Sequence, residues 1–73
     1  MTTNEMVDIA KANVDKTVKF TYHSGDIDLA VVITVDDEGF VYRLTGEGDT
    51  MFWTPFSEIS RIEPITNTLK GST

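Results

Sequence analysis

The segment FWTPFSEISRIEPI, residues 52–65, contains two groups of apolar residues. A proline, a serine and a glutamate separate them. Pro55 cannot donate a backbone hydrogen bond to a strand ladder, so a strand should end there. Residues 56–58 predict a single turn of tight helix, and residues 60–65 predict a last strand in which Pro64 marks an edge or an end. A short strand, a helical corner and another short strand are typical of a small barrel that curls almost closed.

Alternating apolar residues predict four strands before that corner. The first begins near Lys16, with Val18, Phe20 and Tyr22 on one face. Turns rich in glycine and acidic residues separate it from a second strand over 28–35 and from short strands over 40–44 and 50–54. In the second strand we expect one set of side chains to face the core, namely Leu29, Val31, Ile33 and Val35. The opposite set, Ala30 and Val32 with two polar residues, makes the outer face partly apolar, so we expect a helix to cover it.

A helix is expected at the N-terminus. Thr2 and Glu5 have the spacing of a capping box, in which each side chain accepts a hydrogen bond from a backbone N–H of the other residue. An apolar stripe follows at helical spacing over Met6, Ile9, Ala10 and residues 12–14. About ten residues are too few for a helix to be stable alone, so it must pack against the strands.

The length predicts one domain over residues 1–65, followed by a flexible tail over residues 66–73, which has no apolar pattern. A chain of 73 residues buries only about 60% of its unfolded surface. The sequence contains no cysteine, so disulfides cannot supplement the core, and we expect self-association to do so. The fold expected is mainly β: a small five-stranded SH3/Sm-like barrel with a short N-terminal α-helix.

The net charge of −6 disfavours binding to duplex nucleic acid, which depends on clustered lysines and arginines. Two interpretations of the acidity stay open: a well-solvated surface, or an acidic face directed at a basic partner. No apolar run approaches the roughly 20 residues that span a bilayer, and no basic segment followed by an apolar one opens the chain. We therefore expect a cytoplasmic protein that does not enter membranes.

Two segments resemble known families of small barrels. The segment VDKTVKFTYHSGDIDLAVVITVDDEGFVYRL resembles the opening of Sm-like proteins, and VKFTYHSGD together with FSEISRIEPI resembles the two ends of WYL domains. The resemblance covers about residues 4–65 and implies an Sm-type barrel that assembles through its edge strands. It does not extend to the RNA-binding residues of Sm-like proteins, because residues 39–41 and 54–56 read Gly-Phe-Val and Thr-Pro-Phe there.

Polar residues offer weak candidates for catalysis or metal binding. His23 stands beside Ser24 and Asp26, but neighbours on a strand point to opposite faces, so we expect a solvated turn histidine. The turn acids lack the spacing of a calcium loop, and alternate turns of a meander fall at opposite ends of a barrel. The sequence therefore predicts no catalytic residues, no metal site and no cofactor. The acids in question are Asp26, Asp28, Asp36, Asp37, Glu38, Glu47 and Asp49.

An aromatic cluster is the strongest candidate for a binding site. Alternation sends Phe52 and Trp53 to opposite faces, so at least one of these rings should lie outside the core. The outer ring either packs under the helix or at a subunit contact, or it stacks, beside an arginine, on a planar anionic ligand such as a nucleotide. The predicted ligand-binding residues are Trp53, Tyr42, Arg43, Arg61 and Phe52.

These observations predict a non-enzymatic binding module. The first hypothesis is that it self-associates through its barrel edges and acts as an adaptor or inhibitor of a protein partner that presents a basic face. The alternative is an oligomeric protein of bacterial or viral origin that binds a small anionic, nucleotide-like ligand at a subunit boundary, to sequester or sense it.

Overall fold

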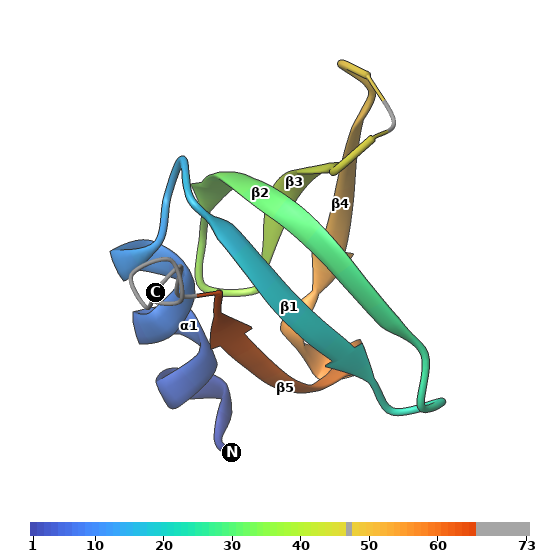
Figure 1. Ribbon diagram of the computed structural model, residues 1–73. Helices are drawn as coiled ribbons and strands as arrows, with labels where there is room; N and C mark the ends of the chain where they lie inside the picture. Colours follow the sequence, from blue (N-terminus) through green and yellow to red (C-terminus); the bar gives the residue numbers. More distant parts are fainter. Residues whose placement is uncertain (47, 66–73) are drawn as a thin grey trace, which may run out of the picture.

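The computed structural model describes residues 1–46 and 48–65, which form one antiparallel sheet of five strands and one short helix (Figure 1). The strand order in the sheet is β4-β3-β2-β1-β5, which leaves β4 and β5 at the two edges. The predicted mainly-β fold is confirmed, whereas the tail predicted over residues 66–73 lies outside the described residues. The elements are α1 (Thr3–Ala12), β1 (Thr17–Tyr22), β2 (Ile27–Val35), β3 (Gly39–Leu44), β4 (Met51–Pro55), the 3₁₀ turn η1 (Phe56–Glu58) and β5 (Ile59–Pro64).

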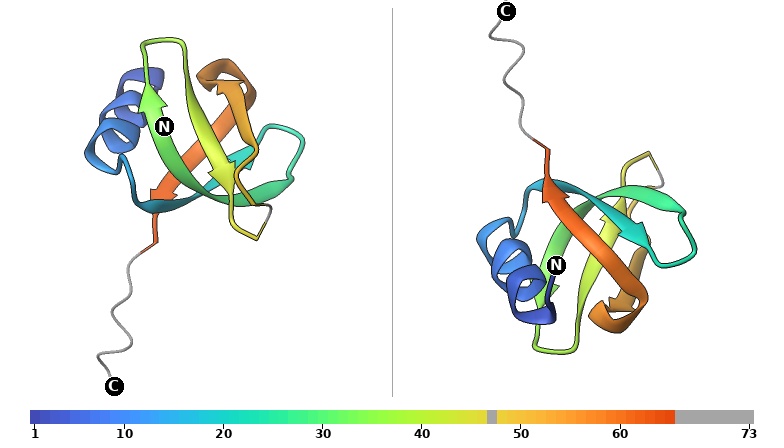
Figure 2. Two further views of the ribbon diagram at one scale, coloured as in Figure 1. Left: turned by 90° about the horizontal axis from the view of Figure 1, so that it is seen from above. Right: turned by 90° about the horizontal axis from the view of Figure 1, so that it is seen from below.

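The sheet curls around a single core, and α1 packs against β2, β5 and η1 (Figure 2). The core consists of aliphatic and aromatic side chains from β1, β2, β3, β5 and η1 together with one face of the helix. Phe20 lies at its centre, with ring centroids 5.2 Å from Phe40 and 5.0 Å from Tyr42, both in edge-to-face geometry. The buried apolar residues are Met6, Val7, Ala10, Val18, Phe20, Ala30, Val32, Phe40, Tyr42, Phe56, Ile59 and Ile62.

The corner between the last two strands forms where Pro55 predicts it. The backbone N–H of Phe56 donates to the carbonyl oxygen of Glu38 at 2.8 Å, so η1 is tied to the turn before β3. Phe56 and Ile59 are buried and anchor the corner in the core. The segment that predicted a barrel therefore turns as expected, and it carries the chain from one edge of the sheet to the other.

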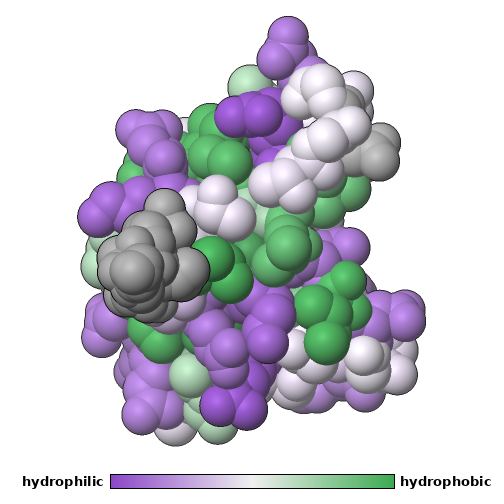
Figure 3. All heavy atoms as spheres, viewed as in Figure 1, coloured by the Kyte–Doolittle hydropathy of each residue, from purple (hydrophilic) through white to green (hydrophobic). Residues whose placement is uncertain are grey.

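The predicted inward face of β2 is wrong. Ala30 and Val32 are fully buried, whereas Leu29 is exposed and Val31 is half-buried. Both faces of β2 are apolar, so the alternation of side chains cannot tell which face is buried. The face with the larger side chains is the one that lies outside. Phe20 and Phe40 already fill the interior, which leaves room there only for smaller side chains. Hydrophobic side chains are accordingly exposed on the outer face of β1 and β2, which lies toward the viewer in Figure 3.

A β-bulge at Ile33 changes the phase of β2. The pairing with β3 shifts between Val32, which pairs with Tyr42, and Thr34, which pairs with Val41. Because one extra residue is inserted, Val35 returns to the core side and packs against the buried cluster. Ile33 is half-buried rather than in the core as predicted.

The N-terminal helix is capped as predicted. Thr2 Oγ1 accepts a hydrogen bond from the Glu5 backbone N–H at 3.1 Å, and Glu5 Oε1 accepts one from the Thr2 backbone N–H at 2.8 Å. These two bonds satisfy N–H groups that have no partner within the helix. The hydrogen bond from the Thr2 backbone lowers the pKa of Glu5 below its ordinary value.

Replacing Thr2 with alanine should lower the free energy of unfolding by about 1 kcal/mol at neutral pH, because the N-cap oxygen is lost. Glu5 has its lowered pKa only in the folded state, so its contribution is complete above the ordinary glutamate pKa and disappears as the pH falls through the folded value. Wild type and the variant should both lose this contribution in acid, because the backbone N–H of residue 2 that donates to Glu5 is present in both, so the destabilisation caused by Thr2→Ala should persist. Urea titrations at neutral and acid pH measure it, with the exposed Thr3→Ala as control; equal destabilisation by both variants would contradict the capping account.

Candidate functional surface

Strand β4 exposes three consecutive large apolar side chains at an edge of the sheet. Met51, Phe52 and Trp53 have exposed fractions of 59%, 39% and 50%. Within the described part of the chain, β4 pairs only with β3, so its other side presents backbone N–H and C=O groups. Natural proteins usually protect such an edge with charges, prolines or a covering segment. An edge strand that exposes large apolar side chains is a candidate binding surface.

The indole of Trp53 rests against the backbone of the neighbouring strand. Trp53 pairs with Val41, and its ring lies over Gly39, where an added Cβ would stand 2.7 Å from Trp53 Cζ2. Such a Cβ would also overlap the backbone carbonyl oxygen of Thr54. Gly39 therefore makes room for the tryptophan, and it lets β3 and β4 approach each other at this point.

A hollow of about 290 Å³ opens beside Trp53. Two carboxylate residues of the β2–β3 turn, Asp37 and Glu38, line it together with the indole. Asp36 holds this turn, because its Oδ1 accepts hydrogen bonds from the N–H groups of Glu38 at 2.7 Å and Gly39 at 2.8 Å. Carboxylates beside an aromatic face favour a cation and disfavour an anion. The remaining lining residues are Thr3, Pro55, Phe56 and Ser57.

One of these two carboxylates, that of Asp37, forms a long ion pair with Lys11. Asp37 Oδ1 lies 3.8 Å from Lys11 Nζ, and both side chains are well exposed. Such a pair contributes little in water, because solvent screens it. Glu38 forms no ion pair within the described residues, so the hollow keeps an acidic character.

Phe52 faces the other side of the sheet from Trp53. Its ring stacks on that of Tyr42, with centroids 5.8 Å apart and an interplanar angle of 27°. Tyr42 is buried, and its hydroxyl lies 3.0 Å from Thr54 Oγ1 and 3.3 Å from the hydroxyl of Tyr22. Phe52 is therefore fixed against the end of the core, while Trp53 faces outward.

The hydroxyl groups behind Phe52 form a directional chain. The Tyr22 hydroxyl donates its one proton to Asp28 Oδ2 at 3.0 Å, so in its contact with Tyr42 it must be the acceptor. The Tyr42 hydroxyl thus donates to Tyr22, and it accepts a hydrogen bond from Thr54 Oγ1. Burial raises the pKa of Tyr22 above its ordinary value, and its hydrogen bonds with Tyr42 and Asp28 raise it further. This series of hydrogen bonds joins β1, β2, β3 and β4, and it gives each of its three hydroxyl groups a partner.

The five predicted ligand-binding residues fall into three places. Trp53 and Arg43 lie on the outer face, in diagonal register, since Arg43 pairs with Met51. Tyr42 and Phe52 lie on the opposite face. Arg61 is on β5, at the other edge of the sheet, where its Nε is 2.6 Å from Glu63 Oε2. One copy of the chain does not bring the five together, and their ligand-binding role stays a prediction.

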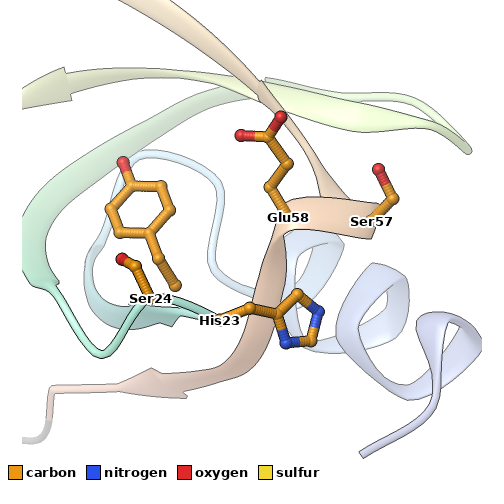
Figure 4. A pocket seen from close by; sticks show the side chains of 5 residues that line it. His23, Ser24, Ser57 and Glu58 are labelled. Carbon is orange, nitrogen blue, oxygen red and sulfur yellow. The ribbon is translucent and has the colours of Figure 1, made fainter.

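A second hollow of about 290 Å³ contains the only histidine of the sequence (Figure 4). His23, Ser24, Ser57 and Glu58 line it, but their side chains point in different directions in the figure. The hydroxyl of Ser24 lies 3.3 Å from Asp26 Oδ2 instead. Within residues 1–46 and 48–65, no hydrogen bond joins the His23 ring to a hydroxyl or carboxylate, so these groups do not form the relay that activates a serine nucleophile.

Sequence reasoning missed Asp37 and Glu38 as neighbours of Trp53. The alternation places Trp53 one residue before the end of the predicted strand, but only the pairing of Gly39 with Pro55 brings the β2–β3 turn to that end of β4. Alternation could have assigned Met51 to the face of Trp53, because the two residues are separated by one position.

Over the described residues, no three potential metal-ligating side chains gather into a cluster, and no helix has the length and apolarity to cross a membrane. No protein-family model matches the chain, and neither the curated proteins nor the solved structures yield a match.

Proposed function

We propose that this chain is a non-enzymatic binding module that engages an extended segment of a protein partner through the edge of β4. The observation that carries the proposal is the run of three exposed apolar residues, Met51 to Trp53, on a strand that, among residues 1–46 and 48–65, pairs with β3 alone. A strand added to this edge would satisfy backbone groups and cover these side chains at the same time. Such a module acts as an adaptor or an inhibitor, according to what the partner segment does elsewhere.

The size of the edge limits the affinity. β4 has five residues, so an added strand would bury less surface than the roughly 800 Å² that each partner contributes to a standard interface. We therefore expect a transient complex, with a dissociation constant on the order of micromolar. Binding should depend mostly on Trp53, because large aromatic residues dominate small interfaces.

The charge near Trp53 supports a protein segment over a nucleotide-like ligand. Asp37 and Glu38 line the same hollow as the indole and would repel phosphate groups. Arg43 lies on the same face, but it pairs with Met51, at the opposite end of β4 from the hollow.

Site-specific crosslinking tests this function. A photoreactive phenylalanine analogue at Met51 should give a discrete adduct in cells that express the chain, and peptide mapping should locate the crosslink in one extended segment. The same analogue at Thr34, an exposed position on β2, is the control. Trp53→Ala should weaken the Met51 adduct at least tenfold while the circular dichroism spectrum is retained. Equal adducts from both positions, or none from Met51, would reject the edge as the binding surface; an adduct with a second copy would identify self-association.

A further inference from the structure

Carboxylates stand at both ends of the exposed edge. Asp49 is exposed and precedes β4 by two positions. At the other end of the strand, Asp37 and Glu38 line the hollow beside Trp53 and Pro55. Within β4 itself the exposed side chains, Met51, Phe52 and Trp53, are apolar. The edge therefore has an apolar middle and two acidic ends.

This charge pattern disfavours a second copy of the chain as the occupant. Antiparallel pairing of two β4 strands would bring Asp49 of one copy to the end marked by Asp37 and Glu38 of the other. Parallel pairing would bring the two Asp49 residues together. Both arrangements oppose like charges, between chains that each carry a net charge of −6.

Strand β5 of a second copy is not complementary either. Its cation, Arg61, is already paired with Glu63 at 2.6 Å, and Glu63 also lies 3.5 Å from Lys19 Nζ. Pro64, the last residue of β5, cannot donate a backbone hydrogen bond.

We infer that the partner of β4 is a short extended segment with a lysine or arginine at each end and uncharged β-branched or apolar residues between them. This inference rests on the proposed function and specifies the partner. Six residue steps separate Asp49 from Pro55, or about 20 Å of extended chain, so the two basic residues should stand about six positions apart. The basic residue at the hollow lies over the indole of Trp53 and between the carboxylates of Asp37 and Glu38.

The partner residue that lies opposite Met51 should not be basic. Arg43 pairs with Met51 and lies on the same face as Trp53, one strand in from the edge. A cation above that row would meet a like charge. The surface thus selects for the positions of the charges in the partner as well as for their sign.

Three synthetic peptides test the inference. Each has seven residues, with alternating threonine and valine in the middle and with lysine, glutamine or glutamate at both ends. Trp53 is the only tryptophan of the sequence, so its fluorescence reports binding beside the hollow, and hydrogen exchange of the β4 amides reports strand addition. The lysine peptide should bind about tenfold more tightly than the glutamine peptide at low salt, and this advantage should decrease as salt rises.

Charge-neutralising variants test which carboxylates cause the tighter binding of the lysine peptide. The double variant Asp37→Asn, Glu38→Gln should remove most of the advantage of the lysine peptide while binding of the glutamine peptide is unchanged. The matched control, Asp26→Asn in the β1–β2 turn, should leave the advantage intact. If all three peptides protect the β4 amides equally, the charge selectivity is wrong and the edge still binds strands. If none of them protects β4 and no crosslink forms at Met51, the proposed function fails as well.

Discussion

Alanine at position 39 should lower the free energy of unfolding by about 3 kcal/mol, which is a large share of the total stability of a domain of this size. The added Cβ would overlap the backbone carbonyl oxygen of Thr54 and would stand 2.7 Å from the ring of Trp53. The indole could move aside, but a backbone carbonyl cannot move without separating β3 from β4. The substitution should therefore weaken the pairing that holds the exposed edge in place, and chemical denaturation measures the loss.

Gly46→Ala is the matched control for that prediction. Gly46 has a φ of 83°, so alanine is strained there, but nothing lies within 4 Å of the added Cβ. The expected cost is about 1 kcal/mol. A smaller loss from Gly39→Ala than from Gly46→Ala would show that close approach of the backbone is not what requires glycine at position 39. The fluorescence of Trp53 should change in the Gly39 variant and stay constant in the control.

Phe20→Ala should lower the free energy of unfolding by about 4 kcal/mol. Phe20 is fully buried and lies in edge-to-face contact with Tyr22 on β1 and with Phe40 and Tyr42 on β3, so its removal leaves a cavity that these fixed rings cannot fill. A domain of this length has a total stability of roughly 4 to 11 kcal/mol. The variant should consequently unfold at a far lower temperature than wild type, as measured by thermal denaturation followed with circular dichroism.

Two further variants keep that prediction open to test if the alanine variant does not fold. Phe20→Leu retains most of the buried volume and should cost about 1.5 kcal/mol. Leu29→Ala removes an exposed side chain from the neighbouring strand and should change stability by less than about 1 kcal/mol. Destabilisation by Leu29→Ala as large as that by Phe20→Leu would mean that the outer face of β2 is buried in solution.

The exposed edge and the acidity of the chain have related consequences. An edge strand with large apolar side chains promotes association with other strands, including those of identical chains. A net charge of −6 opposes such association between copies while leaving basic segments free to approach. The same carboxylates can therefore protect against aggregation and select a partner.

Local sequence determined the elements of this fold. Pro55 ended β4, Thr2 and Glu5 capped α1, and glycines marked the turns, because each of these effects depends on the backbone of a few neighbouring residues. The sequence also predicted that Phe52 and Trp53 would face opposite sides of the sheet, since side chains alternate along a strand. That part of the candidate surface needed no tertiary information.

Tertiary structure decided which face of β2 is buried and what surrounds Trp53. Both faces of β2 are apolar, so burial depended on the volume left by Phe20 and Phe40 and on the bulge at Ile33. The carboxylates of Asp37 and Glu38 reached Trp53 only because β3 and β4 pair from Gly39 to Pro55. The spacing of residues along a strand determines to which face each side chain points. The contacts between strands depend on register and packing, which are determined by all the strands of the sheet together.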